Sequence, residues 1–173
     1  MTRSRPILAL SVALAAGSAQ GADLRLLGGS YGSSGMGEEG PSPIFLAQAS
    51  GRWVSAEVLG GPSAKRESGR GWVARGSVDV WAGSWVSLGV GLTHRDGGDW
   101  TKRPVWIRGG LGPRCARVVV EMTTGSANLE RKVEGIVAWS RGRLTAEGRV
   151  YALKYRQGTG YGAMMALGWR IRR

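Results

Sequence analysis

Residues 72–93 read WVARGSVDVWAGSWVSLGVGLT, and this stretch decides the fold class. Before Gly83 the even positions are apolar or small, whereas the odd positions include Arg75, Ser77 and Asp79. After it, the even positions from 86 to 92 are all valine or leucine, and the odd positions are serine, glycine or threonine. A period of two is the signature of a strand with one apolar and one polar face. The break at Gly83 then predicts a tight turn between two antiparallel strands.

The same alternation recurs along the chain, and no stretch of similar length after residue 21 shows the 3.6-residue period of a helix. The expected strands cover residues 24–31, 43–49, 53–60, 70–81, 85–94, 104–111, 116–124, 132–139, 144–155 and 161–172. Short connections alternate with longer polar ones, so the two kinds fall at opposite ends of a meander. The pattern predicts an all-β, antiparallel up-and-down transmembrane barrel of ten strands. Because the first two stretches are the least regular, an eight-stranded barrel stays an alternative.

The composition fits one all-β domain. The chain has 173 residues, which is the size of a single domain. Its 30 glycines are spread without a fixed period, and each interior glycine costs a helix about 1 kcal/mol, which argues against a helical protein. The single cysteine, Cys115, excludes an internal disulfide framework and a cysteine-rich metal site. Neither a metal nor a cofactor is expected.

Residues 1–21 have the features of a secretory signal peptide. Arg3 and Arg5 give a positive start, and residues 7–16 form a short apolar run. Ala19 and Gly21 are small residues suited to the last positions before a cleavage site. A transmembrane helix would need about 20 apolar residues, twice the length of this run. The expected division is a signal peptide over 1–21 and a barrel domain over 22–173.

Aromatic residues gather near the ends of the expected strands. Near the short connections and the C-terminal end lie Trp53, Trp81, Trp85, Trp139 and Trp169, and near the longer connections lie Tyr31, Trp72, Tyr155 and Tyr161. Bilayer interfaces favour such amphipathic rings, whereas a soluble core would hold tryptophan nearer mid-strand, where burial is greatest. These residues are therefore predicted to be membrane-interface aromatics.

The polar face of the expected strands carries charges of both signs in equal number. The positive ones are Arg75, Arg108, Arg117, Arg149 and Arg170, and the negative ones are Glu57, Asp79, Glu121, Glu134 and Glu147. A solvated outer surface has no need of such balance, but a narrow interior does, because an unpaired buried charge is costly. The balance predicts a barrel lumen filled by pairs of arginine and carboxylate.

Signal peptide, meander, aromatic bands and polar lumen together resemble the small bacterial outer-membrane β-barrel proteins. The resemblance implies a monomer in the outer membrane of a Gram-negative cell envelope, inserted by the barrel-assembly machinery. It also implies a structural or surface-interaction role, or at most a narrow, porin-like channel.

Two other functions stay open. The triplet Gly51-Arg52-Trp53 matches the short Gly-x-Trp signature of lipocalins. A soluble secreted lipocalin-like barrel would bind a small apolar ligand. His94, followed by Asp96 and Asp99, is a candidate general base, because outer-membrane barrel enzymes that hydrolyse lipids or peptides use histidine at the loop end. No serine lies beside His94, so a non-enzymatic role is favoured and no catalytic residue is assigned.

The net charge of +12 suggests nucleic acid at first sight, but a secreted protein rarely meets it. The basic residues at or near the longer connections are Lys65, Arg66, Arg70, Arg95, Lys102, Arg103, Arg131, Lys132, Lys154 and Arg156. Those at the short-turn end are Arg52, Arg114, Arg141, Arg143, Arg172 and Arg173. Lysine and arginine pair with phosphate, so the expected partners are outer-membrane lipids, including the phosphates of lipopolysaccharide, and no nucleic acid.

Overall fold

The fold is a closed, antiparallel β-barrel. The computed structural model describes residues 23–34, 42–63, 71–95, 105–124, 129–155 and 158–172. These residues form ten strands: β1 (Asp23–Ser34), β2 (Ser42–Ser50), β3 (Val54–Ser63), β4 (Gly71–Ala82), β5 (Val86–Arg95), β6 (Val105–Leu111), β7 (Ala116–Thr124), β8 (Leu129–Arg141), β9 (Leu144–Tyr155) and β10 (Gly158–Arg172). The prediction of ten strands is confirmed, and the eight-stranded alternative is wrong.

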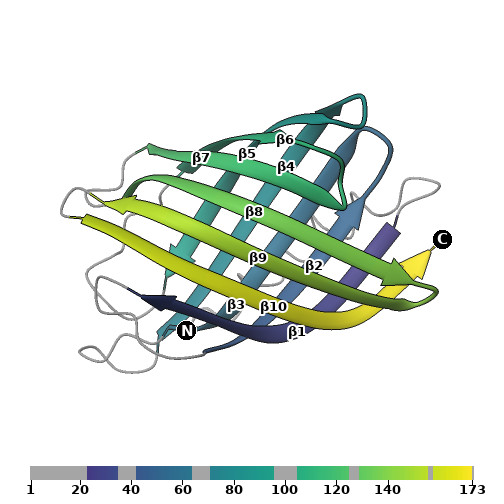
Figure 1. Cartoon of the computed structure of the whole chain (residues 1–173), viewed down its shortest axis with the longest axis horizontal. Coiled ribbons are helices and arrows are strands. Elements are labelled where there is room, and N and C mark those ends of the chain that lie inside the picture. The colour runs from purple at the N-terminus through teal and green to yellow at the C-terminus, as the bar shows by residue number, and fades with distance from the viewer. Residues whose placement is uncertain are drawn as a thin grey trace, which may run out of the picture.

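Each strand pairs with its neighbours in sequence, and β1 closes the sheet against β10 (Figure 1). The closing pair runs from Asp23 opposite Arg172 to Ser34 opposite Tyr161. Closure leaves no strand edge along this seam, so backbone groups there pair within the sheet rather than with solvent. Among the described residues, no helix has the length and apolar character needed to span a bilayer.

The short turns lie at one end of the barrel, on the right of Figure 1, where the β8–β9 turn and the end of β10 are visible. Three of these turns contain a glycine with positive φ: Gly83 at 68°, Gly112 at 114° and Gly142 at 60°. Residues with a Cβ atom rarely adopt a positive φ without strain, so glycine is the residue that lets these turns close tightly.

Six of the ten strands extend further at the long-loop end than the alternation predicts. β3 runs to Ser63 rather than residue 60, β8 begins at Leu129 rather than residue 132, and β10 begins at Gly158 rather than residue 161. Apolar alternation marks only the part of a strand with one apolar face. Backbone hydrogen bonds continue beyond it, because polar residues pair through their main chains equally well.

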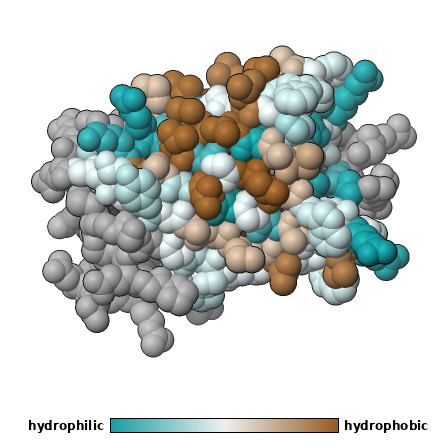
Figure 2. Space-filling view, in the orientation of Figure 1, coloured by the Kyte–Doolittle hydropathy of each residue, from teal (hydrophilic) through white to brown (hydrophobic). Residues whose placement is uncertain are grey.

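The outward-facing rows are apolar. Leu88 on β5, Val137 on β8 and Met165 on β10 are each between 64% and 75% exposed, and most other outward residues are valine, leucine, isoleucine, alanine or glycine. Apolar side chains gather across the middle of the face seen in Figure 2, and hydrophilic ones lie toward the two ends. The barrel thus places its apolar surface outside, the reverse of a soluble protein.

The closing seam requires glycine at one particular position. We expect Gly29→Ala to lower the free energy of unfolding by about 1–3 kcal/mol. A methyl group on Gly29 would overlap the carbonyl oxygen of Met165 and lie 2.6 Å from the Ala166 Cα atom. The matched control is Gly28→Ala, where an added Cβ meets nothing within 4 Å. Urea titration of detergent-refolded protein, followed by far-UV circular dichroism, measures both, and equal stabilities would contradict this account of the seam.

Candidate functional site

The candidate site is the barrel lumen, which is lined by the polar rows of the strands. The structure places all ten charges predicted for the lumen on inward-facing rows, and adds Asp23, Arg25 and Lys132 to them. Among inward strand residues whose side chains the structure describes, there are therefore seven cations and six carboxylates. Such residues are rarely buried unless they are paired, so their partners decide what the lumen does.

Arg149 on β9 is the centre of the first group of charges. Its guanidinium donates two hydrogen bonds to the Glu57 carboxylate on β3, at 2.8 and 2.6 Å. It also donates to Glu147 at 2.6 Å and lies 3.7 Å from Glu134 on β8. Gln48 on β2 donates to Glu57 at 3.1 Å and to Glu147 at 2.8 Å. Because β10, β1 and β2 separate β9 from β3, this group ties distant walls of the barrel together.

A second group of charges joins β4, β6 and β7. The Nε atom of Arg108 lies 3.2 Å from Asp79 Oδ1 and 3.7 Å from Glu121 Oε1, and Arg75 pairs with the same Glu121. Gly89 on β5 stands in register between Asp79 and Arg108. A Cβ atom on Gly89 would overlap the Asp79 carboxylate, so the glycine leaves the space in which this ion pair forms. The glycine-rich inward face of β5 is thus one side of a charged site.

Nearer the long-loop end, Lys132 on β8 points into the lumen, with its Nζ atom 2.8 Å from Glu134 and 4.9 Å from the centre of the Tyr151 ring. The sequence predicts Lys132 near the long-loop end, among the basic residues that would pair with lipid phosphate; it does lie near that end, but its side chain is buried in the lumen. Lys132 lies on the same row of β8 as Glu134 and Ile136, whereas Arg131 lies on the outward row and is exposed. A one-residue difference in a strand reverses the face.

Trp81 and two arginines occupy the lumen at the short-turn end. The indole N–H of Trp81 donates to Ser55 Oγ at 2.8 Å, and the guanidinium groups of Arg114 and Arg117 lie 4.8 and 5.3 Å from its ring centre. Arg117 also lies 3.8 Å from Asp79. Burial, together with the neighbouring cations, lowers the pKa of the Arg114 guanidinium. This end of the lumen is therefore a stack of cations on an aromatic ring.

A small cavity adjoins this stack. It has a volume of about 40 Å³ and is lined in part by Arg25, Asp79, Trp81 and Arg117. The buried Nε atoms of Arg25 and Arg117 find no hydrogen-bond partner in the described part of the chain. Bound water satisfies such atoms in other proteins, and this volume has room for about three water molecules. Next to it, at the rim, Asp23 pairs with Arg170 at 2.6 Å and with Arg25 at 3.4 Å.

One wall of the lumen is apolar, which the prediction of a polar lumen did not include. Leu27 on β1, Ile44 and Leu46 on β2, and Met164 and Ala166 on β10 form a buried cluster on this wall. In β1 and β2 both faces carry apolar residues, so alternation is weak and the sequence does not separate inside from outside there. The interior of the barrel thus contains both charge pairs and this apolar cluster.

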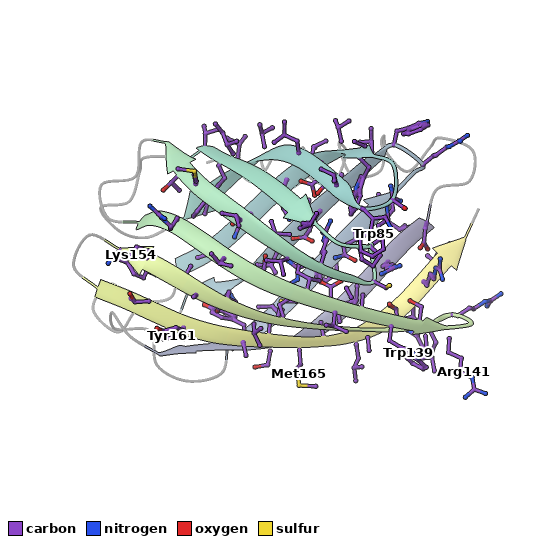
Figure 3. All side chains as sticks on the ribbon, turned by 45° about the horizontal axis from the view of Figure 1, so that its top comes forward. Trp85, Trp139, Arg141, Lys154, Tyr161 and Met165 are labelled. Atoms are coloured by element: carbon purple, nitrogen blue, oxygen red, sulfur yellow. The ribbon has the colours of Figure 1, made fainter. Side chains whose placement is uncertain are left out.

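Of the five predicted interface tryptophans whose side chains the structure describes, four are exposed and one is buried. Trp53, Trp85, Trp139 and Trp169 are between 54% and 61% exposed at the short-turn end, and Tyr161 is 61% exposed at the other end. Figure 3 shows Trp85 and Trp139 toward one end of the barrel and Lys154 and Tyr161 toward the other.

The prediction is wrong for Trp81 and Tyr31. Trp81 is only 2% exposed, because it shares the inward row of Asp79, and Tyr31 packs against the apolar cluster of the lumen. Tyr155 is half-buried at the end of β9. The side chain of Trp72 lies outside the described residues.

The structure does not bear on two of the predicted features. Asp96, Asp99 and the side chain of His94 lie outside the described residues, as do residues 1–21. Within the described part of the chain, no group of three or more histidine, cysteine, aspartate or glutamate side chains is placed to hold a metal ion.

Gln48 and Trp106 are two further lumen residues that the sequence patterns did not identify. Gln48 bridges two carboxylates, and Trp106 donates its indole N–H to Thr93 Oγ1 at 2.7 Å while the Arg75 guanidinium lies 4.7 Å from the centre of its ring. Both lie on the row that carries the charges of their strand or its neighbour. Row position was therefore a signal that could have identified them, whereas their partners across the barrel could not be read from spacing.

Comparison with known proteins finds a similarity of fold alone. No protein-family model matches the chain, and no curated protein matches it. Among solved structures, the chain is similar to the N-terminal β-barrel domain of Pseudomonas aeruginosa OprF, with 7% sequence identity and a TM-score of 0.40. The match covers 88% of this chain and 98% of that domain.

The Arg149 group predicts a large difference between two arginine substitutions. Arg149→Met leaves Glu57, Glu134 and Glu147 without their shared cation, and we expect it to lower the free energy of unfolding by about 3–5 kcal/mol. The matched control is Arg170→Met at the half-buried rim, where about 1 kcal/mol is expected. Urea unfolding in detergent micelles measures both. Similar losses for the two variants would contradict a central role for Arg149.

Proposed function

We propose that the protein is an outer-membrane β-barrel whose lumen is closed by paired charges, and that it has a structural or surface-interaction role in the cell envelope. The observation that carries the proposal is the placement of opposite chemistries on the two faces of one sheet. Exposed apolar side chains cover the outside, and buried ion pairs fill the inside. A soluble protein that binds an apolar ligand would need the two faces exchanged.

The dimensions of the outer face support a bilayer location. On β10 the outward row runs from Tyr161 through Met165 and Leu167 to Trp169, nine residues with an aromatic ring at each end. A tilted strand crosses a bilayer in about 9–11 residues, and aromatic girdles mark its two interfaces. On β8 the apolar outward residues are bounded by Arg131 at one end and Arg141 at the other. Both rows have the length and the ends that a membrane-spanning strand needs.

The long-loop end offers a place for lipid phosphate. Arg131 and Lys154 stand directly opposite each other on β8 and β9, and both are exposed on the outward face. Like charges in this position destabilise a sheet unless an anion lies between them. The phosphates of lipopolysaccharide in the outer leaflet are such anions, so we include outer-membrane lipids among the partners. We also propose a monomer that depends on the barrel-assembly machinery for insertion.

The enzymatic alternative has no comparable support. It rests on His94, Asp96 and Asp99, whose side chains lie outside the described residues.

The choice between a closed barrel and a narrow channel depends on the lumen. Side chains from β3, β8 and β9 meet there around Arg149, and those of β4, β6 and β7 meet around Glu121. Such cross-links favour a closed lumen over an aqueous channel.

The bilayer location predicts which tryptophans contact lipid. Brominated acyl chains quench fluorescence only on contact, so we expect them to quench outward tryptophans and spare those in the lumen. Replacing Trp139 by phenylalanine removes a quenched share of the emission, whereas the matched Trp81→Phe change removes an unquenched share. Fluorescence of the protein in vesicles with and without brominated lipid measures this. A mature protein that is monodisperse without detergent would overturn the proposal.

The closed lumen predicts the absence of steady conductance. Planar bilayers that contain the folded protein are expected to show no steady, large current steps, because two groups of buried ion pairs join non-neighbouring strands across the lumen. Folding of the same preparation is checked by the heat-dependent shift in gel mobility that stable barrels show. Steady large steps from folded protein would contradict the closed lumen and favour the channel.

A further inference from the structure

An apolar groove runs along β9 on the outer face of the barrel. It has a volume of about 380 Å³ and is lined by residues of β1, β8, β9 and β10. Its floor is small, because the outward positions of β9 here are Ala146 and Gly148. The outward residues of the two flanking strands at these register positions are much larger, so the hollow follows from two small residues in succession on β9.

The walls of the groove are the neighbouring strands. Ala146 lies in register between Trp139 on β8 and Leu167 on β10, and Gly148 lies between Val137 and Met165. All four wall side chains are more than half exposed. The two wall strands are about 9.6 Å apart, two strand spacings, and side chains occupy part of that width. The width that remains in the groove suits one extended hydrocarbon chain.

The short-turn end of the groove is positively charged. Arg141 follows Trp139 on the same outward row of β8, and Arg143 stands in the adjoining turn. Both arginines are exposed, and neither forms an ion pair with any side chain in the described part of the chain. Figure 3 shows Met165, Trp139 and Arg141 in succession toward this end of the barrel. The apolar groove thus leads past the ring of Trp139 to two cations. The acyl chain, glycerol and phosphate of a phospholipid follow one another in the same order.

We propose that this groove binds one anionic glycerophospholipid of the periplasmic leaflet. One acyl chain would lie over Ala146 and Gly148, and the phosphate would contact Arg141 and Arg143. The inference rests on the proposed outer-membrane location and adds a specific ligand to it. A second copy of the chain is a poorer occupant, because two copies in one membrane have the same end at the same surface. Their Arg141 and Arg143 side chains would then repel one another.

The test is retention of phosphatidylglycerol by the purified full chain. The protein is extracted from vesicles of phosphatidylglycerol and phosphatidylcholine, and native mass spectrometry counts the lipids that stay bound. Gly148→Leu fills the groove without displacing the sheet, since a Cβ there meets nothing within 4 Å. Gly109→Leu is the matched control, because Gly109 is an outward glycine of β6, away from the groove, with equally open space.

We expect the parent and the Gly109→Leu variant to retain one phospholipid, and the Gly148→Leu variant to retain at least tenfold less. The double change Arg141→Gln and Arg143→Gln is expected to reduce the preference for phosphatidylglycerol over phosphatidylcholine about tenfold. Arg52→Gln, at a different short turn, is its control and keeps the preference. The heat-dependent gel shift shows that each variant is folded.

Equal retention by the parent and the Gly148→Leu variant would overturn the inference. A dimer mass that the Gly148→Leu change removes would also overturn it and identify a second copy as the occupant. In either case the protein still requires detergent, and the proposed membrane location stands. A protein that needs no detergent and retains no lipid would remove both proposals together.

Discussion

Pairing of β1 with β10 is the contact on which the rest of the molecule depends, because it closes the sheet along the seam between the first and last strands. An open sheet with this outer face would expose unpaired backbone groups beside apolar side chains, which is costly in a membrane and prone to aggregation in water. Closure also creates an interior that side chains must fill. The close approach at Gly29 and the charge pairs of the lumen are both consequences of that geometry.

The interior is filled in two ways. Near the seam, Leu27, Leu46 and Met164 pack as an apolar cluster, whereas the wall from β3 to β9 is held by ion pairs. Ion pairs alone are weak evidence of stability, because burying each charge costs several kcal/mol before pairing offsets it. Their value here is positional. Arg149 with Glu57, and Arg108 with Asp79, fix the spacing of strands that are not neighbours.

Much of the fold was readable from the sequence, since alternation depends only on which face of a strand meets an apolar environment. It predicted the strand number, the strand ends at the short turns and the inward row of charges. The predictions failed where nearness to a turn or loop, and not the face of the strand, was used to place a side chain. Nearness to a turn predicts Trp81 at the membrane interface, and nearness to a long connection predicts that Lys132 faces lipid phosphate, but both side chains lie on inward rows and are buried. Tyr31 was misassigned in a strand where both faces are apolar.

The sequence by itself determined the antiparallel barrel, the side of the sheet that carries charge and the aromatic character of both ends. The first two follow from a property that repeats every second residue and the third from nearness to the connections, and none of them needs knowledge of distant contacts. Only the tertiary structure decided that Arg149 pairs with Glu57, 92 positions away, and that Gly89 makes room for the Arg108 pair. It also decided that Ala146 and Gly148 form the floor of a groove. The tilt and closure of the strands set those neighbours, and local periodicity contains no information about them.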